Sequence, residues 1–199
     1  RLNHVYRKLL ENSGVTIIDS RAEIAEPHTV LVDGKKITAK YILVAVGGWP
    51  IVPKLPGSEH AITSNEAFYL PTLPKKVIIV GGGYIGAEFA GIFHGLGVEV
   101  TQLYWGPLFL RGFDDDCRKT LAEEMKKKGV DLRFNADISK IEKKGALLRA
   151  TLSGDVNIDA DQILYATGRV PNTGSLGLEN TSVQMKPDGS VVVDDYSKT

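Results

Sequence analysis

Lys76-Val-Ile-Ile-Val-Gly-Gly-Gly-Tyr-Ile-Gly86 is the stretch that decides the fold of this chain. The apolar run Val77 to Val80 predicts a buried strand, and the G-x-G-x-x-G that follows it opens a helix. In that context Gly81 permits a tight turn, Gly83 lets backbone N–H groups approach a pyrophosphate, and Gly86 lets the helix pack closely on the strand. The stretch therefore predicts a dinucleotide-binding unit with the phosphates at the helix N-terminus.

Strands and helices alternate beyond the glycine loop, and a short antiparallel segment precedes the last strand. The pattern predicts an α/β fold, a Rossmann-like doubly wound parallel sheet with an antiparallel β-meander, over residues 76–171. The predicted elements are the helix 84–96, the strand 98–104, the helix 115–128, the strand 130–134, three short antiparallel strands near residues 138, 147 and 156, and the closing strand 163–166.

An internal repeat defines the rest of the chain. Residues 37–50 return as residues 158–171, with seven of 14 positions identical at an offset of 121. Each copy is an apolar run that predicts a buried strand, and each ends in Ala-x-Gly-x-x-Pro. Gly81 lies 87 residues before Gly168, so an equivalent glycine loop for the first copy would precede the first residue. Residues 1–50 are therefore interpreted as the end of a second dinucleotide-binding unit without its phosphate-binding loop.

Two further boundaries follow from proline content and from the hairpin pattern. Five of the nine prolines fall between Pro50 and Pro74, which predicts a linker over residues 51–75 with a short helix after Ser64. Strands are also predicted at 15–18, 29–32 and 36–38. A final hairpin is predicted to turn at Pro187-Asp-Gly189, after the dinucleotide-binding unit ends at residue 171.

The end of the second predicted strand bears on the choice of nucleotide. An NAD site usually places an acidic residue there for the ribose 2′-OH, whereas an NADP site places an arginine. Here Tyr104 and Trp105 occupy the position, no acid follows before Asp114, and Arg111 is the nearest cation. Arg111 is therefore a candidate ligand of a 2′-phosphate, and NADPH is favoured over NADH. Trp105 either stacks on adenine or only covers apolar surface.

Composition excludes several other classes. The 199 residues hold 24 Lys+Arg and 24 Asp+Glu, so no net charge favours nucleic acid or a membrane surface. No apolar run approaches the roughly 20 residues that span a bilayer, and no signal peptide is visible, so a cytoplasmic location is expected. Four scattered histidines and one cysteine predict no metal site. Cys117 is expected to be a packed or partly covered thiol.

Three motifs resemble the flavin-dependent pyridine nucleotide-disulfide oxidoreductase family, and within it the glutathione reductase and trypanothione reductase type. They are Gly81-Gly-Gly-Tyr-Ile-Gly-Ala-Glu-Phe-Ala-Gly91, Leu110-Arg-Gly-Phe-Asp114 and Ala166-Thr-Gly-Arg-Val-Pro-Asn172. Two more segments, Ile62-Thr-Ser-Asn-Glu-Ala-Phe-Tyr-Leu70 and Gly48-Trp-Pro50, are most similar to the trypanothione-specific members. The resemblance covers the whole chain.

This resemblance implies a homodimeric enzyme in which NADPH reduces FAD, FAD reduces a Cys-x4-Cys disulfide, and the dithiol reduces a disulfide substrate such as oxidised glutathione. It implies that residues 1–50 and 172–199 belong to an FAD-binding domain and residues 76–171 to an NAD(P)H-binding domain. Tyr84 corresponds to a ring that gates the nicotinamide pocket, Glu88 to an acid near the nicotinamide, and Tyr6 to a tyrosine of the disulfide-substrate cleft. The cofactor-binding candidates are Gly47, Gly81, Gly83, Tyr84, Ile85, Gly86, Glu88, Tyr104, Trp105, Arg111, Thr167, Gly168 and Arg169.

The chain also departs from the family pattern. An FAD-binding G-x-G-x-x-G, the redox cysteine pair and the C-terminal interface domain are absent from these residues, so the chain alone is expected to bind nucleotide without reductase turnover or stoichiometric FAD. Trp105 stands where NADPH-dependent relatives carry a second arginine, and Gly86 is more typical of NAD-dependent relatives. The alternatives are an NADH-dependent relative, such as lipoamide dehydrogenase or an NADH oxidase, and a non-catalytic nucleotide-binding module.

Overall fold

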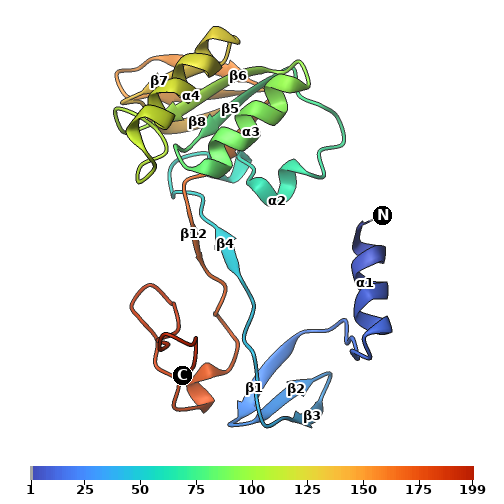
Figure 1. The fold of residues 1–199 in the computed structure, drawn as a ribbon. Helices are drawn as coiled ribbons and strands as arrows, with labels where there is room; N and C mark the ends of the chain where they lie inside the picture. Colours follow the sequence, from blue (N-terminus) through green and yellow to red (C-terminus); the bar gives the residue numbers. More distant parts are fainter. Residues whose placement is uncertain (1) are drawn as a thin grey trace. The chain divides into compact units, whose positions relative to one another are not determined.

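The computed structural model describes residues 2–199 and divides the chain into two compact units (Figure 1). One unit is Gly48–Val170. The other contains the chain up to Gly47 together with Pro171–Thr199. Each unit is described separately below.

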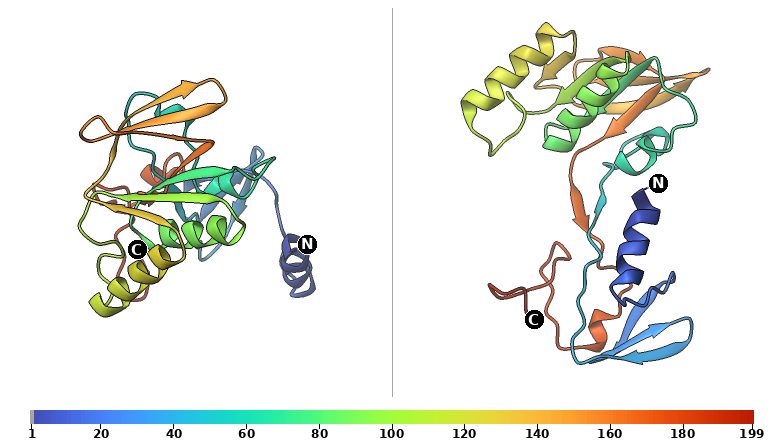
Figure 2. Two further views of the ribbon diagram at one scale, coloured as in Figure 1. Left: turned by 90° about the horizontal axis from the view of Figure 1, so that it is seen from above. Right: turned by 45° about the vertical axis from the view of Figure 1, so that its right-hand side comes forward.

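A four-stranded parallel sheet forms the centre of the Gly48–Val170 unit, in the order β11-β5-β6-β7. Its strands are β5 (Lys76–Val80), β6 (Glu99–Tyr104), β7 (Asp131–Phe134) and β11 (Gln162–Tyr165). The crossover helices α3 (Tyr84–Gly95) and α4 (Asp115–Lys127) cover one face of this sheet. The antiparallel strands β8 (Ile138–Lys144), β9 (Leu147–Leu152) and β10 (Asn157–Ala160) cover the other face (Figure 2).

Alternation along β5 explains the three layers. Val77 and Ile79 pack with the helices in one apolar cluster, whereas Ile78 and Val80 pack with the β-meander in a second cluster. A strand segment buried on both faces must be apolar at every position, as Val77 to Val80 are. The predicted α/β fold class with its parallel sheet and antiparallel meander is confirmed.

Helix α4 begins and ends as its sequence predicts, but it buries a different face. The Asp114 carboxylate accepts hydrogen bonds from the N–H groups of Asp116 and Cys117, and acidic residues fill the first turn. The buried side chains are Ala122 and Met125. Cys117 is exposed, so the prediction of a covered thiol was wrong. Cys117 lies in the first turn of α4, on the same side of the helix as Leu121. The side that is buried against the rest of the unit is the one with Ala122 and Met125.

The linker between the repeat and β5 holds β4 (Gly48–Pro50), a 3-10 turn η1 (Ser58–His60) and the one-turn helix α2 (Ser64–Ala67). A capping box starts α2, because Thr63 and Glu66 exchange side-chain and backbone hydrogen bonds. β4 pairs with β12 (Arg169–Pro171), so the ends of the two repeat copies form a two-stranded sheet with each other.

The second unit contains α1 (Leu2–Asn12), a three-stranded antiparallel sheet and the 3-10 turn η2 (Leu178–Asn180). The sheet strands are β1 (Ala22–Glu26), β2 (Thr29–Val32) and β3 (Lys35–Thr38). The returning segment contacts this sheet, since the Ile24 N–H donates to the Leu176 carbonyl at 2.7 Å. β1 was not predicted, because its Ala and Glu residues have low strand propensity. The last hairpin is reduced to an isolated bridge between Met185 and Val191.

Two strand predictions in this unit were wrong. Residues 15–18 form no strand, and neither do residues 41–46, the apolar run of the first repeat copy. Tyr41 and Leu43 are 81% and 86% exposed. The second copy becomes β11 because β5 lies beside it and supplies backbone hydrogen bonds. Among the described residues no strand pairs with 41–46, and an apolar run without such a partner does not form a strand. Over residues 2–199, no helix is both long and apolar enough to cross a membrane.

Candidate functional site

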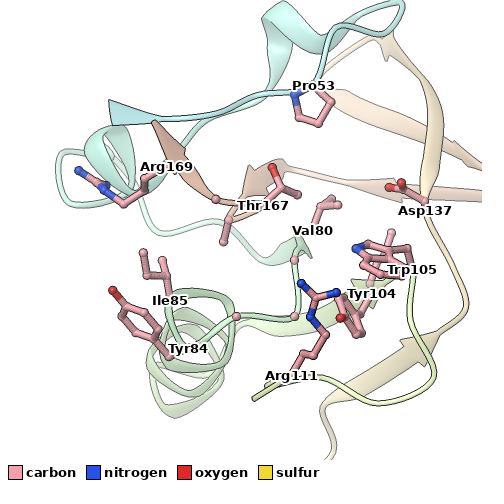
Figure 3. A pocket seen from close by; sticks show the side chains of 16 residues that line it. Pro53, Val80, Tyr84, Ile85, Tyr104, Trp105, Arg111, Asp137, Thr167 and Arg169 are labelled. Atoms are coloured by element: carbon pink, nitrogen blue, oxygen red, sulfur yellow. The ribbon is translucent and has the colours of Figure 1, made fainter. Parts of the chain in front are cut away.

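A cavity of about 660 Å³ opens at the carboxyl ends of β5, β6 and β11 (Figure 3). Ligands of open parallel sheets bind at this edge. The glycine loop, the end of β6 with its following loop, and the end of β11 supply most of the lining. The lining residues are Pro53, Val80, Gly81, Gly82, Gly83, Tyr84, Ile85, Leu103, Tyr104, Trp105, Arg111, Asp137, Ala166, Thr167, Gly168 and Arg169.

The glycine loop is shaped by close backbone contacts on one side and by open space on the other. Gly81 has φ +137°, and a Cβ there would lie 2.3 Å from the Ala166 carbonyl oxygen. A Cβ on Gly86 would lie 2.7 Å from the Gly81 oxygen, whereas one on Gly83 would meet nothing within 4 Å. Gly83 caps α3 without any side-chain hydrogen bond to the first turn. This backbone can receive an anion at the helix N-terminus.

Tyr104 is held between two glycines. A Cβ on Gly82 would lie 2.4 Å from Cδ2 of its ring, and one on Gly106 would lie 2.7 Å from Cε1. The Tyr104 side chain lines the cavity and is only 9% exposed. Sequence reasoning assigned no role to Gly82, although the unbroken run of three glycines and the glycine after Trp105 were visible signals.

Trp105 and Arg111 come from one loop and line the cavity together with Tyr104. Trp105 is 61% exposed, and its ring centroid lies 5.3 Å from that of Tyr104. In Figure 3 the Arg111 guanidinium points toward the glycine loop. The Leu110 N–H donates to the Gly82 carbonyl at 2.6 Å, which ties the Arg111 backbone to that loop.

The opposite end of the cavity is formed by Tyr84 and Ile85 of α3 and by the turn after β11 (Figure 3). The Tyr84 ring is exposed. Thr167 Oγ1 donates to the Ile51 carbonyl at 3.1 Å, and Arg169 Nη2 donates to the Gly48 carbonyl. These bonds hold the turn to the linker, so the side chains of Thr167 and Arg169 have a structural use beside any ligand contact.

Four predicted site residues do not line this cavity. Gly86 and Glu88 lie on α3, where Gly86 is buried and Glu88 is exposed one turn after Tyr84. Gly47 and Tyr6 belong to the other unit, where Gly47 accepts a hydrogen bond from the Asn172 N–H and Tyr6 is exposed on α1. Their proposed contacts with cofactor or substrate stay predictions.

Three polar residues in or beside the cavity were missed from the sequence: Asp137, Tyr165 and Gln102. Asp137 lines the cavity, and its carboxylate accepts from the Ile138 N–H at 2.8 Å. Burial, and then the charge of Asp137, raise the pKa of Tyr165, whose hydroxyl has no hydrogen-bond partner among residues 2–199. Buried Gln102 donates from Nε2 to the Gly81 carbonyl at 2.9 Å and so steadies the glycine loop.

No group of three His, Cys, Asp or Glu residues in the described part of the chain could hold a metal ion.

Comparison with known proteins agrees with this geometry. Residues 1–199 match the family described as Pyridine nucleotide-disulphide oxidoreductase. The glutathione reductase of Burkholderia cepacia is 46% identical over an alignment of 200 positions, which covers 100% of this chain and 44% of that protein. The trypanothione reductase of Trypanosoma congolense is 40% identical over 169 residues, which are 83% of this chain and 34% of that protein.

Solved structures show the same relationship. The HOCl-induced flavoprotein disulfide reductase RclA from Escherichia coli superposes with a TM-score of 0.87 at 32% identity, over 96% of this chain and 45% of that one. The chain therefore spans less than half the length of each of these relatives.

Proposed function

Because the chain belongs to the pyridine nucleotide-disulphide oxidoreductase family, we propose that the Gly48–Val170 unit binds a nicotinamide dinucleotide in the cavity above the glycine loop. The observation that carries this proposal is the open side of Gly83 at the uncapped start of α3. Backbone N–H groups of the first turn can donate to the pyrophosphate there, and a side chain at residue 83 would take up that space.

The two ends of the cavity differ in the groups that they offer. Trp105 and Arg111 offer an exposed ring and a cation, which suit adenine and a ribose phosphate. Tyr84 and the turn at Gly168 line the other end, which we assign to the nicotinamide. A bound nucleotide supplies a hydride from its nicotinamide ring. The residues of this chain bind and orient the nucleotide, and we assign the exposed Tyr84 ring to gating the nicotinamide end of the cavity.

We propose NADPH as the preferred nucleotide. Support comes from Arg111, which lines the cavity and forms no ion pair with an acidic side chain among the described residues. Trp105, in the position of a second arginine, and Gly86 favour NADH instead, so the NADH-dependent reading is the second candidate.

For the whole protein we propose reduction of a glutathione-type disulfide by NADPH, in which one disulfide and two electrons with two protons give two thiols. Support comes from the names of the relatives that are 40% to 46% identical. The residues of this chain do not make up a flavin and dithiol relay, because its sequence holds one G-x-G-x-x-G and one cysteine. A homodimer and a cytoplasmic location remain predictions.

The experiment is calorimetric titration of NADPH and NADH at fixed salt against wild type and Arg111→Ala. A charge-assisted bond to a 2′-phosphate is worth about 1.5–3 kcal/mol, so NADPH should bind roughly 10- to 100-fold more weakly and NADH nearly as before. Arg149→Ala is the matched control, because Arg149 forms a two-bond pair with Asp159 on the β-meander and does not line the cavity. An equal loss for both nucleotides in Arg111→Ala would favour the NADH assignment.

A further inference from the structure

Arg118 makes an unusual set of contacts just outside the cavity. It lies in the first turn of α4, and its side chain is only 16% exposed. Nε donates to the Phe109 carbonyl at 2.8 Å and Nη2 to the Leu108 carbonyl at 2.7 Å, while Nη1 pairs with the Asp115 carboxylate at 2.5 Å. All three guanidinium nitrogens are therefore used within the protein. Two of them hold successive carbonyl groups of the loop between β6 and α4.

The loop that Arg118 holds has a backbone conformation that needs support. Leu110 has φ +56°, a left-handed conformation that a leucine adopts at a cost unless its surroundings enforce it. The Leu110 N–H donates to the Gly82 carbonyl at 2.6 Å, and the Leu110 carbonyl accepts from the Phe113 N–H at 3.1 Å. Leu110 is therefore held by the glycine loop on one side, while its neighbour Phe109 is held by Arg118.

Arg111 follows this held pair directly, so its direction depends on the same backbone. Trp105 does not depend on it, because Tyr104, fixed between Gly82 and Gly106, anchors the start of the loop separately. A change at Arg118 should therefore disturb the Arg111 end of the loop and spare the Trp105 end.

We propose that Arg118 is a positioning residue for nucleotide selectivity: it holds the Leu108 and Phe109 carbonyls so that Arg111 faces the ribose phosphate. This inference rests on the proposed function of Arg111. Arg118 itself does not line the cavity, and each of its three guanidinium nitrogens already donates within the protein, so it acts through Arg111 and not by touching the nucleotide.

The first test needs no nucleotide. Hydrogen exchange of the Leu110 amide is measured in wild type, Arg118→Ala, Arg118→Lys and the control Arg149→Ala. Lysine keeps the charge but cannot hold two carbonyls in the guanidinium geometry. Leu110 should exchange about 10-fold faster or more in both Arg118 variants and at the wild-type rate in Arg149→Ala, while the amides of β5 stay protected. The β5 amides report whether each variant is folded. If Arg118→Ala does not fold, the exchange of Leu110 is measured in Arg118→Lys instead. Wild-type exchange at Leu110 in a folded Arg118 variant overturns the proposal.

The second test measures selectivity with NADPH and NADH as the probes. Arg118→Ala should weaken NADPH about 10-fold and leave NADH within about 2-fold, and Arg118→Lys should fall between wild type and alanine. Removing both arginines should weaken NADPH no further than Arg111→Ala alone, because the two residues act through one contact. Equal weakening of both nucleotides, or a fully additive loss, contradicts the positioning role. If Arg111→Ala itself does not discriminate between the nucleotides, the proposed function of Arg111 is wrong, and the exchange of Leu110 still decides whether Arg118 holds the loop.

Discussion

Gly82 and Gly83 are neighbours in the glycine loop, yet alanine should have opposite effects at the two positions. A Cβ on Gly82 would lie 2.4, 2.5 and 2.7 Å from three atoms of the Tyr104 ring, which are closer than real Cβ contacts. Gly106 lies close to the opposite edge of the ring, since a Cβ built on it would come within 2.7 Å of Cε1, and this proximity limits how far the ring can turn away. A Cβ on Gly83 would meet nothing within 4 Å. Neither glycine has a left-handed φ, so backbone strain does not enter the comparison.

The size of each effect follows from these distances. Inserting a methyl group into a packed site typically costs about 1–3 kcal/mol. For a unit of the size of Gly48–Val170 that lowers Tm by roughly 3–15 °C. Gly83→Ala should leave Tm unchanged or raise it slightly, because alanine restricts the unfolded chain by about 0.4–1 kcal/mol. Its methyl group should instead occupy the space proposed for the pyrophosphate and weaken both nucleotides.

The assay combines thermal unfolding followed by circular dichroism with titration of NADPH and NADH. Gly82→Ala should lose stability, and Gly83→Ala should lose nucleotide affinity while keeping its Tm. The loss in Gly82→Ala should be smaller in a Tyr104→Ala background, with a coupling free energy of about 0.5–3 kcal/mol. A Gly82→Ala variant with the wild-type Tm would refute the packing of Tyr104 between the two glycines. An equal loss of Tm in Gly83→Ala would refute the open side of the loop.

Three further changes test the neighbouring contacts. Gly86→Ala puts a Cβ 2.7 Å from the Gly81 carbonyl, so it should cost about 1–3 kcal/mol in unfolding free energy and weaken both nucleotides; wild-type values in both measurements would contradict this. Trp105→Ala should weaken NADH and NADPH together if the ring stacks on adenine, whereas unchanged titrations would leave it as a cover for apolar surface. Hydrogen bonds from the Thr63 side chain, and then from the Thr63 backbone, hold the pKa of Glu66 below its ordinary 4.5. The ionised carboxylate therefore stabilises the fold above pH 4.5, and this stabilisation is lost as the pH falls through the lowered pKa of the folded state. Thermal unfolding of wild type and Glu66→Gln should therefore differ near neutral pH and converge in acid, and a difference that does not change with pH would refute the role of the ionised group.

The sequence by itself determined the α/β unit and most of the residues that line its cavity. The order of strands and helices from residue 76 to residue 165 depends on local signals that need no distant partner to be recognised. These signals are the apolar run before Gly81, the glycines that must turn or approach backbone, and the acidic start and glycine end of α4. The residues that line the cavity next to this loop were accordingly predictable, including Tyr84, Arg111 and Gly168.

Only the tertiary structure decided the features that depend on distant neighbours. The repeat gave two nearly equivalent apolar runs, but only the second became a strand, because β5 lies beside it and pairs with its backbone. Three contacts join segments that are far apart in sequence or on different elements. The Tyr104 ring packs against Gly82, the Arg118 guanidinium donates to the loop before Arg111, and the Asp137 carboxylate lines the cavity. The residue pattern of a segment shows which side chains it can bury and which hydrogen bonds it can form. The packing of the whole unit decides which other segment provides the contacts and the hydrogen-bond partners.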